Sequence, residues 1–301
     1  MTSVKRKKTP AYVIAIHVFF ILLSLCYILP MMLVISASFT EERVLVNGGY
    51  SLFPAKATLD AYQMAFRNSG SIVKAYQVTI AESVLGTILT TFMMGLAAYP
   101  LSRSNFRFKT PITWYIFFTM LFGGGAIPTY IIYTKYYGLL NSFWVYILPG
   151  IAGGAWGILC FRAFFKSVPE SLFESAKIDG ASELLCYVRI AIPLSTPIVA
   201  TQAFMGLIGR WNDWTTSYVY IRDPNLYTLQ YLLQRTLNEI EFIKSMTSGS
   251  SGVQVDVSNM KLPAESMKYA LCVIAAGPML LVFPLFQKYF ARGLVIGSVK
   301  G

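Results

Sequence analysis

The sequence predicts an all-α polytopic membrane protein with six transmembrane helices. Of its 301 residues, 55% are hydrophobic and only 13% are charged, against roughly a quarter charged in an ordinary soluble domain. Apolar stretches of about 20 residues, the length that crosses a bilayer as a helix, recur along the chain. Lys and Arg lie mainly outside these stretches, so the net charge of +11 is better explained by cytoplasmic loops than by nucleic-acid binding.

The sequence contains few residues that could form a metal site or a catalytic site. His17 is the single histidine, and the cysteines are too far apart to indicate a metal site or a disulfide framework: Cys26, Cys160, Cys186 and Cys272. No G-x-x-x-x-G-K-[ST], H-E-x-x-H or nucleophile-elbow motif occurs, so the chain has no known loop for nucleotide phosphates and no recognisable catalytic site. We expect neither an enzyme nor a bound metal or cofactor.

The first predicted helix follows a basic N-terminus. Residues 1–10 contain a Lys-Arg-Lys-Lys run, expected in the cytoplasm, and an apolar run from 11 to about 35 comes next. This run exceeds the roughly 7–15 apolar residues of a cleaved signal peptide, so we expect an uncleaved helix. The polar segment 37–76 then lies on the outer side.

The second helix is predicted over 78–101, and the third over 111–133. A Gly-Gly-Gly-x-x-Pro motif interrupts the third helix. Such a break indicates either a kink or backbone that lines a pathway through the protein, and both interpretations stay open. Three cations between the two helices mark the cytoplasmic side: Arg103, Arg107 and Lys109.

The fourth helix is predicted over 143–165, and Arg162 and Lys166 return the chain to the cytoplasm. Glycines at three- and four-residue spacing predict a smooth packing face on it: Gly150, Gly153, Gly154 and Gly157. The sixth helix, 269–286, follows an outer segment, 222–268, that contains an amphipathic stretch over 228–237 and a flexible bend over 248–252. The cations after it keep the C-terminus inside: Lys288, Arg292 and Lys300. Both termini are therefore expected in the cytoplasm.

The fifth helix, 198–221, carries Arg210 and Asp213 near its middle. Ionisable groups at that depth are candidates for a functional site, such as an ion relay in a secondary transporter. The alternative is a pair within one helix beside an aromatic belt at the membrane interface. The neighbouring polar and aromatic side chains suit contacts with sugar rings and hydroxyls: Trp211, Asn212, Trp214 and Tyr218.

The segment 168–197, between the fourth and fifth helices, is the longest polar segment on the basic side. Its pattern predicts two short helices separated by Gly180, the first entered at Pro169 and the second capped by Ser182. Periodicity alone is equally consistent with an ordinary interfacial loop.

The residues Glu174-Ser175-Ala176, then Gly180, then Ile190 and Ile192-Pro193 resemble the Glu-Ala-Ala loop of ATP-binding-cassette (ABC) importer permeases, with Ser175 where that family usually has Ala. The W-N-D-W and Y-T-L-Q motifs, L-P-A-E-S-M-K-Y-A and the F-Q-K-Y-F-A-R-G ending are similar to the carbohydrate-uptake (maltose-type) branch, above all to polysaccharide and oligosaccharide permeases of Gram-positive bacteria. The resemblance covers nearly the whole chain.

This resemblance implies a type I importer permease (MetI-like) fold in the bacterial plasma membrane. It implies a second homologous permease chain, two cytoplasmic ATPase subunits that bind ATP and Mg²⁺, and an extracellular or periplasmic solute-binding protein that delivers a carbohydrate; a non-sugar solute is the alternative. The loop residues implied in coupling to the ATPase are Glu174, Ser175, Ala176, Asp179 and Gly180. The residues expected along the substrate pathway are Arg210, Trp211, Asn212, Asp213, Trp214 and Tyr218.

Overall fold

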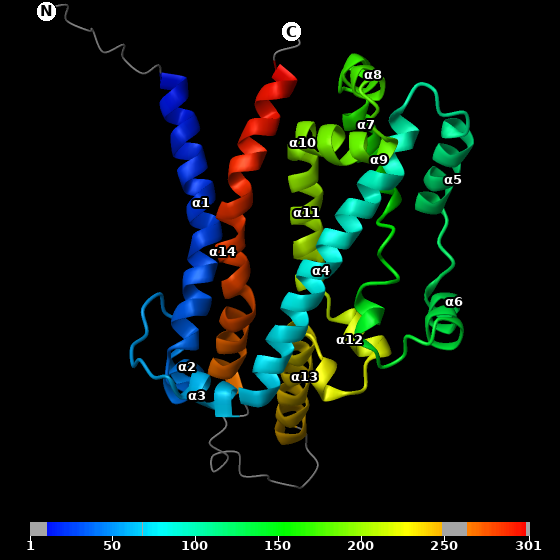
Figure 1. The fold of residues 1–301 in the computed structure, drawn as a ribbon. Helices are drawn as coiled ribbons and strands as arrows, with labels where there is room; N and C mark the ends of the chain where they lie inside the picture. Colours follow the sequence, from blue (N-terminus) through cyan, green and yellow to red (C-terminus); the bar gives the residue numbers. More distant parts are fainter. Residues whose placement is uncertain (1–10, 68, 249–263, 299–301) are drawn as a thin grey trace, which may run out of the picture. The chain divides into compact units, whose positions relative to one another are not determined.

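The computed structural model describes residues 11–67, 69–248 and 264–298, which lie mainly in helices (Figure 1). Within these residues the β-type pairing is limited to one bridge, between Thr40 and Ala57, so the predicted helical class is confirmed. The basic N-terminus 1–10, most of the bend predicted over 248–252 and Lys300 lie outside the described residues. The chain divides into two compact units: Met1–Ser69 with Leu237–Ala276, and Gly70–Thr236 with Gly277–Gly301.

The described residues of unit 1 form three helices and parts of two more. The elements are α1 (Ala11–Ser38), α2 (Glu42–Gly48), α3 (Asp60–Arg67), the end of α13 (Leu229–Ser248) and the start of α14 (Ala264–Ser298). The Glu42 carboxylate accepts the backbone N–H groups of Glu265 and Ser266 at 2.9 and 2.8 Å. It satisfies two of the donors that the first turn of α14 cannot pair internally, where a negative charge is also favoured.

Unit 2 is organised around α4 (Ser69–Ser102), which runs from the end where α12 and α13 lie to the end where α8 and α9 lie (Figure 1). The other elements that lie wholly in unit 2 are α5 (Lys109–Leu121), α6 (Ala126–Ile131), the π-helix η1 (Ile132–Tyr136), the 3-10 helix η2 (Phe143–Tyr146), α7 (Ala155–Phe165), α8 (Glu170–Ile178), α9 (Glu183–Cys186), the π-helix η3 (Tyr187–Ala191), α10 (Ile192–Leu194), α11 (Thr196–Trp211), α12 (Thr215–Tyr220) and the 3-10 helix η4 (Pro224–Leu226).

Three described helices are long and apolar enough to cross a membrane: Tyr12–Ser38, Gly70–Ser102 and Glu265–Gln287. Two bent pairs raise the number to five if each pair is one span: Lys109–Leu121 with Ala126–Tyr136, bent by 109°, and Glu183–Leu194 with Thr196–Trp211, bent by 86°. A multi-pass membrane protein is therefore supported, whereas the predicted number of six helices is not confirmed.

The predicted fourth helix is wrong in its first half. Residues 143–146 form a 3-10 turn, and the continuous helix α7 begins only at Ala155. The cause is local, because Pro149 lacks a backbone donor and Gly153 adopts a left-handed φ of 74°. Gly150, Gly153 and Gly154 thus lie before the helix rather than on a smooth helix face, and only Gly157 lies within α7.

The third and fifth predicted helices are each broken. Gly125, with φ 85°, lies in the break between α5 and α6, and a 109° bend is far more than a kink. The fifth ends as α11 at Trp211 and resumes as α12 at Thr215.

Candidate functional site

The knob, which we define as α8, the turn at Gly180 and α9, has the two-helix form that the sequence predicts. At the end of α8 the Gly180 N–H donates to the Lys177 carbonyl at 3.0 Å, and the Ala181 N–H donates to the Ala176 carbonyl at 2.9 Å. These two bonds, with Gly180 at φ 83°, form a Schellman motif. Ser182 then caps α9 by accepting the Leu185 N–H at 3.3 Å.

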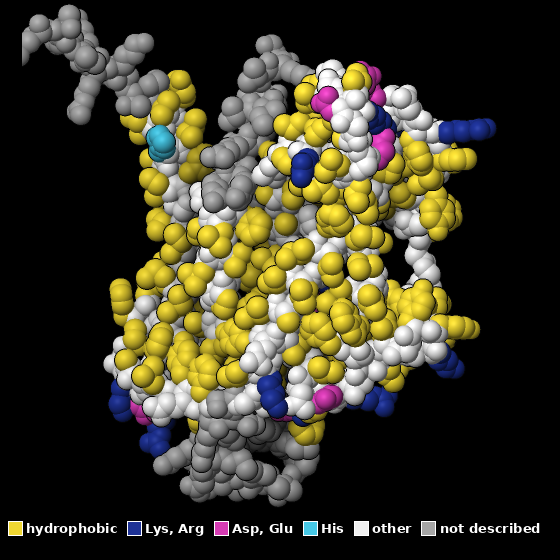
Figure 2. All heavy atoms as spheres, viewed as in Figure 1, with side chains coloured by type: hydrophobic (Ala, Val, Ile, Leu, Met, Phe, Trp, Pro, Cys, Tyr) yellow, Lys and Arg dark blue, Asp and Glu magenta, His cyan; other side chains and the backbone are white. Residues whose placement is uncertain are grey.

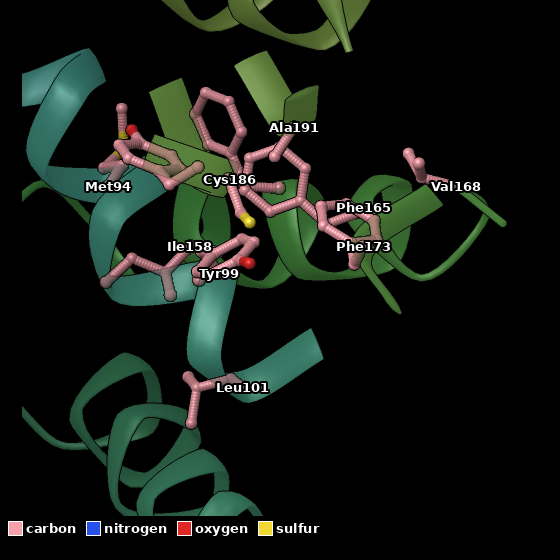
Figure 3. Close-up of a cluster of buried hydrophobic side chains, with 12 residues drawn as sticks. Met94, Tyr99, Leu101, Ile158, Phe165, Val168, Phe173, Cys186 and Ala191 are labelled. Atoms are coloured by element: carbon pink, nitrogen blue, oxygen red, sulfur yellow. The ribbon is translucent and has the colours of Figure 1, made fainter. Parts of the chain in front are cut away.

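One side of the knob is fixed to the end of α4 by apolar packing. Phe173 is 2% exposed and belongs to a buried cluster drawn from α4, α7, α8, α9 and η3 (Figure 3). The Arg103 guanidinium, just after α4, lies 3.8 Å from the centre of the Phe173 ring and donates to the Phe165 carbonyl at 3.1 Å. A cation over an aromatic face that also has a carbonyl acceptor holds α8 in one orientation.

Polar bonds join α9 to the same support. The Tyr99 hydroxyl, on α4, donates to the Glu183 carboxylate at 2.9 Å, and Lys177 pairs with that carboxylate at 2.6 Å. The Tyr187 hydroxyl donates to the Phe92 carbonyl at 2.7 Å. Both helices of the knob are therefore attached to α4, so the knob and the C-terminal end of α4 form one structural piece.

The opposite side of the knob is exposed. Glu174, Ser175, Asp179 and Gly180 are exposed, whereas Ala176 is half-buried and packs on the cluster. Ile178 at the tip is 86% exposed, and a Cβ added to Gly180 would meet nothing within 4 Å. Figure 2 shows acidic and basic side chains together around α8. Four of the five predicted coupling residues thus share a free surface, and the fifth supports it.

The polar clamp, which we define as Arg210, Glu82, Thr90 and the Tyr146 carbonyl, joins three segments deep in unit 2. Arg210 on α11 donates to the Tyr146 carbonyl at 2.7 Å and to the Thr90 hydroxyl at 2.8 Å, and its guanidinium lies 3.6 Å from the Glu82 carboxylate. Glu82 is 1% exposed. A Cβ at Gly86 would lie 2.4 Å from the Arg210 guanidinium, so glycine at this position makes room for it.

Asp213 has a different role from the predicted pair with Arg210. Its carboxylate accepts the backbone N–H groups of Thr215 and Thr216 at 2.9 and 3.1 Å and therefore caps α12. Because α11 ends at Trp211, Arg210 and Asp213 do not share one helix, and the expectation of an intrahelical pair is wrong.

The predicted sugar-contacting residues separate into two groups. Trp211 is 5% exposed, and its ring centre lies 6.5 Å from that of Tyr76. Its ring is therefore not accessible to a solute. Asn212 is exposed, and Trp214 and Tyr218 are 40% and 65% exposed with ring centres 5.9 Å apart.

Three residues of the clamp were not identified from the sequence: Glu82, Thr90 and Tyr146. Glu82 is an acidic residue within the apolar segment predicted over 78–101, and the rule that singled out Arg210 applies equally to it. The part played by the Tyr146 carbonyl could not be read from side-chain types, because its availability depends on the break before α7.

Residues 86–296 match the family described as binding-protein-dependent transport system inner membrane component. This chain is 37% identical to the polygalacturonan/rhamnogalacturonan transport system permease protein YtcP of Bacillus subtilis. The alignment covers 95% of this chain and 97% of YtcP. The maltodextrin transport system permease protein MdxG of the same organism is 26% identical, over 96% of each chain.

Among solved structures, a bacterial ABC transporter involved in the import of the acidic polysaccharide alginate is similar to this chain, with a TM-score of 0.78, 26% identity, and coverage of 96% of this chain and 100% of that one. The helical fold, the exposed knob and these matches all indicate an importer permease. The chain belongs to the family of binding-protein-dependent transport system inner membrane components and is a permease subunit of an ABC importer, a transporter complex with ATPase and solute-binding components.

Proposed function

We propose that this permease subunit imports oligosaccharides or polysaccharide fragments, and that its knob transmits the work of ATP hydrolysis to the membrane helices. The named relatives support the substrate class, since they transport polygalacturonan, rhamnogalacturonan and maltodextrin. The observation that carries the mechanism is the knob itself: one side is fixed to α4, and the other presents Ile178 with 86% of its surface exposed.

The proposed complex contains a second homologous permease chain, two cytoplasmic ATPase subunits and an extracellular solute-binding protein. ATP and Mg²⁺ bind to the ATPase subunits, and the knob docks into one of them. In the proposed topology the N-terminus 1–10 and the coupling loop 168–197 face the cytoplasm, the segments 37–76 and 222–268 face outward, and residues 11–301 form a permease domain of six spans. The charge distribution supports this orientation.

Each knob residue has a physical role in the proposed docking. Glu174 and Asp179 present acidic groups to a basic group of the ATPase, and Ser175 is small enough for close backbone approach. Ala176 sets the packing of α8 on the buried cluster. Gly180 makes the turn between the helices and leaves the surface open, because nothing lies within 4 Å of the position of its missing Cβ.

Gly180→Trp is the test of coupling. Its indole ring would extend into open space, towards the docked ATPase. We expect both ATP-dependent uptake and stimulated ATPase activity of the reconstituted complex to fall at least about tenfold. The reason is that an obstructed interface loses more than about 1.4 kcal/mol of docking free energy. Gly49→Trp is the matched control, since Gly49 also has a left-handed φ, 73°, and open space around it. Intact uptake in the Gly180 variant would show that coupling does not pass through the knob.

A further inference from the structure

Two loops at the end of unit 2 that lies away from the knob are joined by Asn141 (Figure 1). One loop, 137–142, follows η1, and the other, 221–223, follows α12. The Asn141 N–H donates to the Tyr220 carbonyl at 2.8 Å, and the Asn141 Oδ1 accepts the N–H groups of residues 222 and 223 at 3.0 and 2.8 Å. Asn141 has a left-handed φ of 55°, the one such value outside glycine among the described residues. These hydrogen bonds hold it in a conformation that is otherwise costly.

Buried apolar side chains anchor the same two loops from beneath. Leu139 and Ile221 are 6% and 4% exposed and belong to one buried cluster. The Tyr133 ring stacks on the Tyr137 ring with centres 6.2 Å apart, and its centre lies 5.9 Å from that of Tyr220. Loops that are fixed by both hydrogen bonds and packing lose little further conformational freedom when a partner binds. They therefore form a preorganised surface.

Large polar side chains cover this support. We define the outer platform as five exposed residues: Lys74, Lys135, Tyr136, Tyr137 and Arg222. Tyr136 and Tyr137 are 78% and 64% exposed, and Figure 2 shows Lys and Arg side chains around α6 and α12. Tyr and Arg are among the residue types that contribute most to binding at protein–protein interfaces. The composition of the platform is therefore typical of a docking surface.

The charge of the platform is positive. The Lys135 ammonium and the Arg222 guanidinium have no partner within the part of the chain that the structure describes. The Lys74 Nζ donates to the neutral amide oxygen of Asn225 at 2.6 Å, so its charge is not compensated there. The carboxylate of the same loop, Asp223, accepts the backbone N–H and the side-chain amide of Asn225 at 2.9 and 2.8 Å. Three cations beside one carboxylate favour a partner with an acidic face.

We propose that the outer platform is a docking surface for an acidic patch on the solute-binding protein. The family of this chain is described as binding-protein-dependent, so a partner of this kind contacts the permease from outside. Tyr136 and Tyr137 provide the desolvated centre of the contact. Lys135 and Arg222 pair with carboxylates of the binding protein and accelerate its association. The inference rests on the proposed function, because that function places this end of unit 2 on the outer side.

Two other occupants would also explain exposed tyrosine rings. A belt at the membrane interface accounts for the rings, but not for the hydrogen bonds of Asn141 that join two polar loops, or for the unpaired cations beside the rings. A contact with the second permease chain would cover the rings as well. It differs from the proposed docking in one measurable respect, because its loss would weaken assembly of the transporter.

The test is binding of the cognate solute-binding protein, without added saccharide, to the complete transporter in lipid nanodiscs. Tyr136→Ala and Tyr137→Ala should each raise the Kd about fivefold to thirtyfold, as expected for loss of an aromatic contact at the centre of an interface. Lys135→Gln combined with Arg222→Gln should slow association about tenfold and make its rate less dependent on salt concentration. Lys135→Arg combined with Arg222→Lys should keep the wild-type association rate.

Tyr115→Ala is the matched control, because Tyr115 is 70% exposed and lies on α5, outside the platform; the Kd of this variant should equal that of the wild type. Equal Kd values in the wild type and the platform variants, or no binding to the wild type, would overturn the docking surface. Loss of the second permease chain from the purified Tyr136→Ala complex would also overturn it, since the platform would then join the two permease chains.

ATP-driven uptake of saccharide separates this failure from failure of the proposed function. If the wild-type transporter imports saccharide while the platform variants bind the solute-binding protein normally, only the docking surface is wrong. If the wild-type transporter imports none, the proposed function is wrong.

Discussion

Arg210 illustrates, at the scale of one residue, how a charge is accommodated inside a membrane protein. Its guanidinium has two hydrogen-bond acceptors and a carboxylate within 3.6 Å, drawn from α4 and from η2. Glu82 depends on it, because the Glu82 Oε1 atom has no hydrogen-bond partner in the described part of the chain. Removing one member of a buried charge pair costs more than removing both, because the remaining charge stays desolvated.

Arg210→Met should therefore lower the free energy of unfolding by about 3–5 kcal/mol, because the Glu82 carboxylate is left buried without its partner. Adding Glu82→Gln to that variant should recover part of the loss. Thermal unfolding of the purified chain in detergent measures both changes. Arg222→Met, at an exposed loop position, should leave the transition within about 0.5 kcal/mol of the wild type. A double variant less stable than the single one would contradict a pairwise clamp.

The sequence was sufficient to select Arg210 and Asp213 as unusual, but not to assign their partners. Arg210 pairs with a residue 128 positions away along the chain, a tertiary contact that one sequence does not reveal. Asp213 has a local role, and the signal for it was present: an Asp two residues before Thr215 is a usual helix start. The assumption of one continuous fifth helix concealed that signal.

At the scale of elements, helix ends are predicted correctly where proline, glycine and capping residues mark them in the sequence. Pro169, Gly180 and Ser182 define the ends of α8 and α9, and all three act as predicted because caps and left-handed turns depend on neighbouring residues alone. The fourth predicted helix is wrong in its first half because Pro149 and the glycines after it prevent a continuous helix in spite of the apolar character of the segment. In a membrane, irregular backbone persists where neighbouring segments satisfy it, as Thr90 does for the Gly150 carbonyl at 3.2 Å.

The packing of α7 on α4 gives a prediction about these glycines. A Cβ at Gly157 would lie 2.4 Å from the Met94 sulfur and 3.1 Å from the Gln202 Oε1, and Met94 is itself buried in the core cluster. Gly157→Val should therefore destabilise the chain by about 2–3 kcal/mol through overpacking. Gly154→Val, where a Cβ meets nothing within 4 Å, is the control and should change little. Equal transition temperatures for the two variants would show that the α4–α7 contact is looser than described.

The attachment of the knob to α4 gives a second element-scale prediction. Arg103→Lys keeps the charge but loses the planar stack over Phe173 and the bond to the Phe165 carbonyl. We expect ATPase activity to become partly uncoupled from uptake, with about twofold to fivefold less solute moved per ATP hydrolysed, since such a contact contributes roughly 0.5–1 kcal/mol. Arg107→Lys, whose guanidinium lies 6.0 Å from the Phe108 ring, serves as the control. An unchanged ratio of solute to ATP in the Arg103 variant would argue against this contact as part of the link.

At the scale of the whole molecule, composition predicts the class and the cation distribution predicts the orientation. Neither predicts how many segments cross as single helices, because hydropathy does not distinguish a straight span from a bent pair. The resemblance of the Glu174 to Pro193 segment to a known loop identified the family correctly, and the match of residues 86–296 confirms it. Substrate residues stayed the least predictable part, since burial separates Trp211 from Trp214 and Tyr218.

The orientation leads to a labelling prediction. In a variant whose four cysteines are replaced by Ala, Ser175→Cys should react with a membrane-impermeant maleimide only after the cytoplasmic side is opened, because the coupling loop is proposed to face inward. Arg222→Cys, exposed at the other end of unit 2, should react in intact cells. Labelling of the Ser175 variant in intact cells would place the knob on the wrong side for an ATPase.

The two bends, of 109° and 86°, also have a consequence for how the protein is made. A ribosome-bound chain can release a straight apolar helix into lipid as soon as it is complete, but a sharply bent one carries unpaired peptide groups that lipid cannot satisfy. We therefore expect the segment Lys109–Tyr136 to leave the insertion machinery only when α7, which packs against α5, has been synthesised. Nascent chains arrested after residue 140 should keep this segment cross-linked to the translocon, and chains arrested after residue 260 should release it; early release would show that the bend forms after insertion.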